Sequence, residues 1–329
     1  MMYPVVDLHS DLLSFLAHQT GRSPDDPASR SSYSDMRKGN VMLQTLAIFA
    51  RTAPDSIDRG CQQIHHFRKL LDQAPSRFAL VTKNLEPSSL IYLIPAFENA
   101  SAFCSEIEPL NSVFLRLQEI LNQIEIIFYI TITWDGENRF GGGVGASCGL
   151  KHDGKCLLEW LSGKRIAIDL SHASDKLAHE IVEYIDKENL TIPLMASHSN
   201  FRHVTPMPRN LPDSIAKEII RRKGIIGLTF FAPFIHKCDP SALLRHVEYA
   251  LSLGGEQAIA FGSDFFCDTD FSLLKYKYPD SPFFFEEHKN ASVFPHILAQ
   301  MQEKLSLSSD TLSRIAHKNA QHFLNNFIL

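Results

Sequence analysis

The sequence lacks several patterns that mark common classes of protein. Its six cysteines include no CxxC pair, which in a chain of this size indicates reduced thiols rather than a disulfide framework. No apolar run reaches the length of a membrane span. No long basic run occurs, and the net charge is −5 at pH 7, which argues against binding to nucleic acid. No GxGxxG or P-loop follows the first expected strand, which argues against a dinucleotide-binding oxidoreductase.

The size and composition favour an ordinary globular protein. Hydrophobic residues make up 44% of the 329 residues, which allows a sizeable core, and the length suits one large barrel or two smaller domains. An apolar strand is expected within the first few residues, so we expect no signal peptide and a cytoplasmic location.

Eight short apolar runs recur along the chain, and most are continuous rather than alternating, as in strands buried on both faces. Helix-like segments lie between many of them, for example at 56–74, 174–189, 213–224 and 240–255. This alternation predicts an α/β fold, a (β/α)₈ TIM-like barrel that forms a single domain over residues 1–329. A doubly wound open sheet is the alternative. The tail at 305–327 is expected to be a helix that covers the barrel, and residues 20–40 a long polar loop.

The first apolar run ends in DLHSD, with His9 and Asp11 two residues apart. In an extended chain such residues face the same side. Burying a carboxylate without a partner costs roughly several kcal/mol, so these polar residues at the end of an apolar run need an explanation. One possibility is that Asp11 caps a following helix and that His9 is a hydrogen-bonded core residue. The other is a metal site with further ligands elsewhere in the chain.

Four other apolar runs also end in a residue able to bind a metal or move a proton. These residues are Glu98, His172, His198 and Asp264. Each taken alone has an ordinary structural explanation. In a TIM-like barrel, however, catalytic groups lie at the carboxyl ends of the strands, so closure of the barrel would bring all of these side chains to one rim.

Imidazoles and carboxylates without a thiolate suit zinc, although manganese, iron or cobalt are also possible. The set exceeds what one catalytic ion needs. We therefore expect two Zn²⁺ ions that share a bridging carboxylate and a bridging hydroxide, which supplies a nucleophile without a reactive serine or cysteine. Asp264 is expected to accept and return the proton.

Together these stretches resemble the renal or membrane dipeptidase family of zinc peptidases, within the amidohydrolase-type barrels. The matching motifs are DLHSD, AFENA, IAIDLSH, MASHSNFRHVTPMPRNLPD and FGSDF, and they follow the order of the family across nearly the whole chain. The resemblance implies hydrolysis of dipeptides at a binuclear zinc centre. It also suggests a homodimer, and a possible tolerance for a D-residue at the second position.

Transferred by position, the family's metal ligands would be His9 and Asp11 for one ion, Glu98 as the bridge, and His172 and His198 for the other. Two further residues would contact the substrate. Arg209 would pair with its terminal carboxylate through two parallel hydrogen bonds, and Asp264 would contact its amine. Alternative interpretations are a surface salt bridge for Arg209 and a strand-end cap for Asp264.

Two positions depart from the family pattern. Trp134 stands where many members have a histidine that is thought to polarise the scissile carbonyl. Its indole N–H can still donate a hydrogen bond but cannot become cationic, and it equally suits packing of the pocket wall. Asn99 follows Glu98 where a glycine is common, and we expect its side chain to narrow the space beside the metals.

Two other functions remain open at this stage. One is a related hydrolase that acts on a lactone, a cyclic amide or a phosphoester. The other is a non-catalytic barrel that binds a ligand at a drifted site. The PRN arginine favours a substrate with a carboxylate.

Overall fold

The computed structural model describes residues 3–83 and 85–329. Eight parallel strands pair in a closed ring, in which β2 bonds to β4 and β9 returns to β1. This confirms the predicted (β/α)₈ barrel. The eight strands are β1 (Val5–Asp7), β2 (Val41–Phe49), β4 (Ile91–Glu98), β5 (Tyr129–Thr131), β6 (Ala167–Asp169), β7 (Leu194–Ala196), β8 (Ile225–Leu228) and β9 (Ile259–Phe261).

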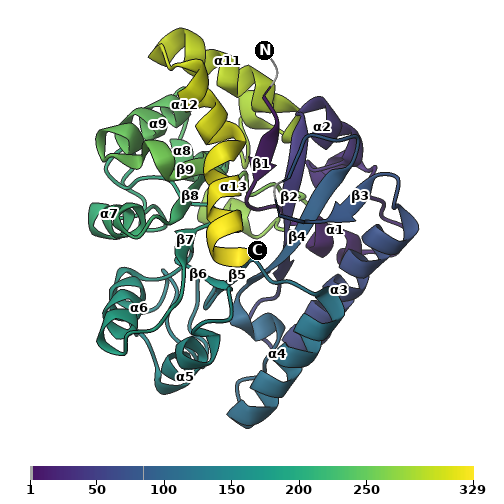
Figure 1. Ribbon diagram of the computed structural model, residues 1–329, viewed down its shortest axis with the longest axis vertical. Helices are drawn as coiled ribbons and strands as arrows, with labels where there is room; N and C mark the ends of the chain where they lie inside the picture. Colours follow the sequence, from purple (N-terminus) through teal and green to yellow (C-terminus); the bar gives the residue numbers. More distant parts are fainter. Residues whose placement is uncertain (1–2, 84) are drawn as a thin grey trace.

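The helices surround the strands (Figure 1). The main ones are α1 (Leu12–His18), α3 (Ser56–Gln73), α4 (Leu110–Ile124), α5 (His152–Leu161), α6 (Asp175–Lys187), α7 (Asp213–Arg221), α8 (Ala232–Ile235), α9 (Ala242–Ser252), α10 (Leu274–Lys277) and α11 (Phe294–Leu305). No helix in the described ranges combines the length and apolar character needed to cross a membrane.

Two short elements differ from the sequence expectation. Strand β3 (Phe78–Leu80) pairs with the first residues of β4, and it lies outside the predicted alternation because no helix separates it from β4. The expected loop at 20–40 contains a helix, α2 (Tyr33–Lys38), whose first turn is capped because the Ser32 hydroxyl accepts a bond from the Asp35 amide. Met36 anchors this helix, since its side chain is fully buried.

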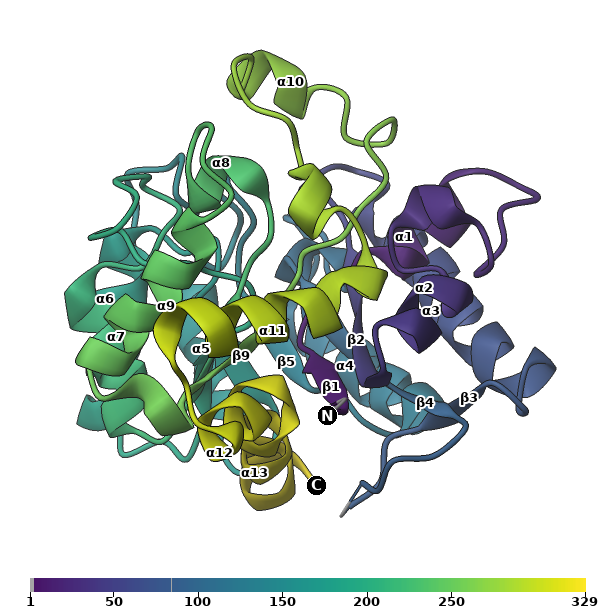
Figure 2. The same ribbon diagram turned by 90° about the horizontal axis from the view of Figure 1, so that it is seen from above.

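The chain tail covers the end of the barrel where the strands begin. It consists of consecutive helical segments over Ser309–Ser313, Arg314–Lys318, Asn319–Phe323 and Leu324–Ile328. Asn319 donates to the carbonyl of Ile259, the first residue of β9, and Phe323 packs against Phe128, just before β5. Figure 2 places this tail (α12 and α13) and α10 at opposite ends of the barrel. The carboxyl ends of the strands are therefore left for the site.

Candidate metal centre and active site

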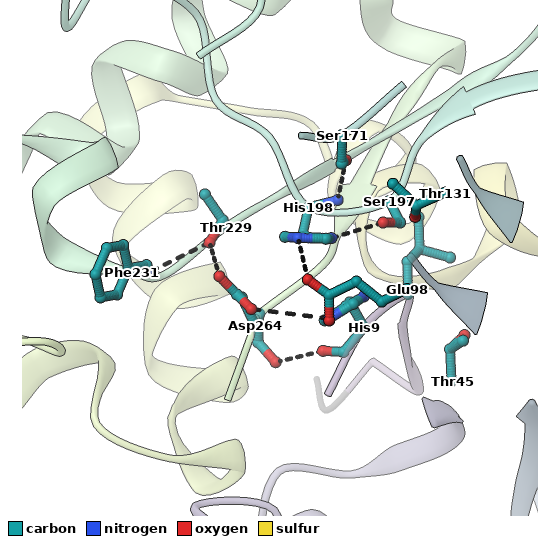
Figure 3. A network of polar contacts seen from close by, with 12 residues as sticks. His9, Thr45, Glu98, Thr131, Ser171, Ser197, His198, Thr229, Phe231 and Asp264 are labelled. Carbon is teal, nitrogen blue, oxygen red and sulfur yellow. Dashed lines mark hydrogen bonds and ion pairs between the residues drawn. The ribbon is translucent and has the colours of Figure 1, made fainter. Parts of the chain in front are cut away.

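The carboxyl ends of the strands bring the predicted metal ligands together. His172 Nε2 lies 2.9 Å from Glu98 Oε1, and His198 Nε2 lies 3.8 Å from the same oxygen. The other Glu98 oxygen lies 3.4 Å from His9 Nε2. Glu98 thus faces imidazoles with both oxygens, as a bridging ligand requires. Figure 3 shows His9, His198 and Asp264 pointing toward Glu98.

Three overlapping groups have ligand atoms within 4.8 Å of one another and are close enough to hold an ion. One group is His9, Asp11 and Glu98, and a second is Glu98, His172 and His198. These two sets share Glu98 and match the predicted sets for two ions. A third group joins His9 and His198 to Asp264, which places Asp264 beside the centre.

The turns that follow the strands orient several of these side chains toward the centre. The backbones of His172 and Asp264 are left-handed, with φ of 66° and 63°, a conformation that is strained for residues with a side chain and is often found at functional sites. The Asp264 amide donates to the carbonyl of His9 at 3.1 Å, which ties the turn after β9 to the segment after β1. Asp11 precedes α1, but its side chain makes no capping hydrogen bond there. The capping explanation for Asp11 therefore fails.

Hydrogen bonds fix the ring tautomers of His9 and His198. The Tyr129 hydroxyl donates to the carbonyl of Leu8, so its oxygen is left to accept from His9 Nδ1 at 2.7 Å. The Ser197 hydroxyl donates to Asp169 at 2.6 Å and accepts from His198 Nδ1 at 2.6 Å. With a metal bound, both rings would keep a proton on Nδ1 and present the Nε2 lone pair to the centre, which is the usual arrangement of metal-bound histidines.

The third histidine is held by a carboxylate. Asp135 accepts from His172 Nδ1 at 2.9 Å, and its other oxygen accepts from Lys277 Nζ at 2.7 Å. Burial would raise the pKa of Asp135, but the bond and charge of His172 and the charge of Lys277 lower it well below its usual value. The Nε2 atoms of His172 and His198 are 3.0 Å apart. With both Nδ1 atoms protonated, these would be two facing lone pairs, which a cation between them would stabilise.

The carboxylates and imidazoles of the centre shift one another's pKa values. Burial alone would lower the pKa of His9, but the charge of Glu98 raises it to about 9. Burial alone would raise the pKa of Glu98, but the charge of His9 and the close contact with His172 lower it to about 2. Burial lowers the pKa of His198 well below its usual value. Burial also raises the pKa of Asp11 well above its usual value.

The donor set fits divalent cations. Asp11 Oδ1 is buried and has no hydrogen-bond partner within residues 3–83 and 85–329, and the buried His9 Nε2 faces the carboxylates of Glu98 and Asp264 without a well-formed hydrogen bond. A buried polar atom without a partner is unfavourable by about 1–3 kcal/mol, and both atoms belong to one of the groups able to hold an ion. Metal binding would satisfy them, and nitrogen and oxygen ligands of this kind suit zinc.

A cavity lies directly over the centre. Asp11, Glu98, His172 and Asp264 lie at its polar side. Trp134 forms part of its wall, 5.9 Å from the His172 ring between ring centroids. The segment after β9, which carries α10, contributes Leu274 and Tyr278 to the wall. This segment therefore overhangs the site.

Arg209 is buried beside the metal ligands rather than on the surface, with 5% of its area exposed. Its guanidinium donates to the Ser199 hydroxyl at 2.8 Å and to the His198 carbonyl at 3.2 Å. Within the described part of the chain no carboxylate forms an ion pair with Arg209, and its Nε has no partner. The salt-bridge alternative is therefore wrong, and a buried cation remains that an anionic ligand would neutralise.

Asn99 does not act as expected. Its backbone is left-handed, with a φ of 72°, which suits glycine and, less well, asparagine. Its amide donates to the carbonyl of Ala50 at 2.8 Å and accepts from Asn138 at 3.0 Å, and Asn99 is not among the residues lining the cavity. The side chain therefore connects neighbouring loops instead of narrowing the site.

Sequence reasoning missed the residues that orient the ligands. These residues are Tyr129, Asp135, Asp169 and Lys277. They lie within or after apolar runs or in distant loops, and no regular spacing in the sequence links them to the histidines. Only Asp169 had a local signal, because it ends β6 and sits inside the IAIDLSH motif. There it accepts bonds from Thr131, Ser171 and Ser197.

A closed parallel barrel that gathers imidazoles and carboxylates at the carboxyl ends of its strands is the architecture of a metal-dependent hydrolase. The chain belongs to the membrane dipeptidase family, peptidase family M19, whose family model matches residues 1–326. This confirms the resemblance inferred from the motifs. The protein is therefore a hydrolase of the metal-dependent dipeptidase class.

The chain is also similar to individual proteins and solved structures. One relative is an uncharacterized protein in the pqqA 5′ region of Klebsiella pneumoniae. It is 25% identical to this chain over 231 residues, which cover 64% of this chain and 80% of the relative. The fold of this chain is similar to that of a metallopeptidase from Rhodobacter sphaeroides bound to a phosphinate mimic of L-Ala-D-Ala, with a TM-score of 0.83, 20% identity, and coverage of 99% of this chain and 100% of that chain. It is also similar to the probable dipeptidase PvdM from Pseudomonas aeruginosa, with a TM-score of 0.76, 15% identity, and coverage of 99% and 95%.

Proposed function

We propose that this protein hydrolyses dipeptides at a centre of two divalent cations, zinc being the best fit. His9 and Asp11 would bind one ion, His172 and His198 the other, and Glu98 both. Support comes from the two groups of ligand atoms that share Glu98 and from the three histidines, each of which has a partner at Nδ1. When bound, the ions would polarise the peptide carbonyl and lower the pKa of water.

The observation that carries the choice of substrate is the buried guanidinium of Arg209. A peptide's terminal carboxylate would supply the missing anion, and the guanidinium fork matches that group. A lactone or a neutral cyclic amide would leave Arg209 buried without a counter-charge. A carboxylate placed there also limits the length of the peptide, because the scissile bond must lie at the metal centre nearby.

Asp264 is the proposed proton carrier. Its carboxyl lies beside the metal ligands His9 and His198 and lines the cavity, so it is within reach of both the attacking water and the leaving amine. Asp264 would accept a proton from the attacking water as the new C–O bond forms. It would return the proton to the amine nitrogen as the C–N bond breaks. The Trp134 indole N–H is the proposed donor to the carbonyl oxygen.

The test is hydrolysis of L-L and L-D dipeptides by the metal-loaded protein, with each C-terminal amide as the matched control substrate. We expect the metal-loaded protein to cleave free dipeptides and to lose this activity after chelation. For the amides, kcat/KM should be at least about 100-fold lower, because the buried charge of Arg209 is left unpaired. In Arg209→Met, kcat/KM for the free dipeptides should fall to that for the amides. Hydrolysis of no dipeptide, or equal rates on acids and amides, would contradict the proposal.

We also propose that the enzyme tolerates a D-residue at the second position, since the similar Rhodobacter sphaeroides metallopeptidase binds a mimic of such a dipeptide. The single-domain assignment to residues 1–329, the homodimer and the cytoplasmic location likewise remain proposals, as does the lack of contact with nucleic acid or membrane.

A further inference from the structure

Apart from the metal ligands, most of the residues that line the cavity are aromatic. Phe231 and Phe234, which follow β8, and Tyr278, which follows α10, all line it. They form one cluster: the ring centroid of Phe231 lies 4.8 Å from that of Phe234 and 5.4 Å from that of Tyr278, and Phe234 lies 5.9 Å from Tyr278. We call these three residues the aromatic wall.

The aromatic wall lies beside the residue that would hold the substrate carboxylate. The guanidinium carbon of Arg209 is 5.5 Å from the centre of the Phe234 ring. A dipeptide with its carboxylate on Arg209 has its C-terminal α-carbon only two bonds from the carboxylate oxygens. The side chain on that carbon would therefore lie against Phe234 and its neighbours in the wall.

The same cavity offers no partner for a charged side chain. Arg209, which lies just beyond the lining residues, would already be paired with the terminal carboxylate, and no lysine or arginine of the described ranges lines the cavity itself, so an acidic side chain would find no counter-charge of its own. Of its carboxylates, Asp135 is already bonded to His172 and Lys277, and Asp11, Glu98 and Asp264 belong to the centre. A lysine side chain would therefore also lose its hydration without compensation.

From this arrangement we propose that the enzyme selects dipeptides whose C-terminal residue has a large apolar side chain, with the aromatic wall as the specificity-determining surface. The inference rests on the proposed dipeptidase function and deepens it by naming the substrate class. Burial of an apolar side chain against such a wall changes kcat/KM by about tenfold or more.

The experiment compares Gly-Leu and Gly-Phe with Gly-Gly, Gly-Asp and Gly-Lys, and adds Leu-Gly as the reversed peptide. We expect kcat/KM for Gly-Leu and Gly-Phe to exceed that of the other three by at least about tenfold, and that of Leu-Gly by several-fold. Equal rates across the panel would overturn this inference and leave the dipeptidase function standing. Hydrolysis of none of them would remove both.

Variants on α10 and just after it test the wall itself. Tyr278→Ala should reduce the Gly-Leu to Gly-Gly ratio of kcat/KM at least about fivefold, since removal of the ring opens the wall. Tyr278→Phe should restore the ratio, because the ring rather than the hydroxyl contacts the side chain. Tyr276→Ala is the matched control, because Tyr276 is 85% exposed. The ratio is independent of metal content and of the folded fraction. A ratio unchanged in Tyr278→Ala, or a preference that appears only at the N-terminal residue, would refute the proposal.

Discussion

Metal binding by the metal-free protein should strengthen steeply as the pH rises, because a proton on His9 occupies the place of a cation. Glu98 raises the pKa of His9 to about 9, so its Nε2 is protonated at neutral pH in the metal-free protein. A metal ligand must be deprotonated. Binding an ion between His9 and Glu98 therefore displaces that proton.

The size of the effect follows from the pKa. Below a pKa of about 9, each pH unit changes the cost of removing the proton by about 1.4 kcal/mol. Between pH values of about 6.5 and 8.5 the apparent affinity of the first ion should therefore rise about 100-fold, or about 2.7 kcal/mol. About one proton should therefore leave His9 for each centre filled.

The same proton affects stability with the opposite sign. Because the pKa of His9 is raised from 6.5 to about 9 on folding, its contribution to stability is complete below pH 6.5 and is lost as the pH rises through about 9. Considering His9 alone, the metal-free protein should become less stable over the window in which it binds metal more tightly.

Calorimetric titration with Co²⁺ in two buffers of different ionisation enthalpy measures both the affinity and the protons released. The expected result is a rising affinity with release of about one proton at pH 7. An affinity that is the same at both ends of the pH range, with no proton released, would refute the reasoning about His9 and Glu98.

Three further substitutions have defined outcomes. Asp135→Asn should weaken metal affinity about 10–100-fold, since it alters the partner of His172, and metal analysis after dialysis measures the loss. Asp153→Asn, which disturbs an ion pair with Arg139, is the control and should keep its metal. An equal loss of metal in both variants would argue against the role of Asp135. Asp264→Asn should lower kcat about 10²–10⁴-fold with the metal content retained, and unchanged turnover would exclude Asp264 as the proton carrier. Phe67→Ala should destabilise the fold by about 3–5 kcal/mol, because Phe67 is fully buried on α3; urea unfolding measures this, and a loss below about 1 kcal/mol would contradict it.

The barrel and its ligands were predictable because both follow from the strands. Strands buried on both faces give continuous apolar runs, and a polar residue at the end of such a run stands out. Closure of the barrel then brings His9, Glu98, His172 and His198 to one rim without further information. Strand β3 was not predicted because it is followed directly by β4 without an intervening helix, so it does not belong to the strand–helix alternation.

The groups that orient these ligands were not predictable in the same way. Lys277 reaches Asp135 across 142 positions of sequence, and Tyr129 reaches His9 across 120. Such pairs depend on how the barrel closes and on where the loop after β9 lies, and no local spacing encodes them. The direction of the Asn99 side chain was missed for the same reason, because its partners Ala50 and Asn138 come from other loops.

Anomalous diffraction from crystals grown with zinc decides whether two cations share Glu98. We expect two anomalous peaks, one bounded by His9, Asp11 and Glu98 and the other by Glu98, His172 and His198. A single peak, or metal bound only at positions away from Glu98, would contradict this expectation.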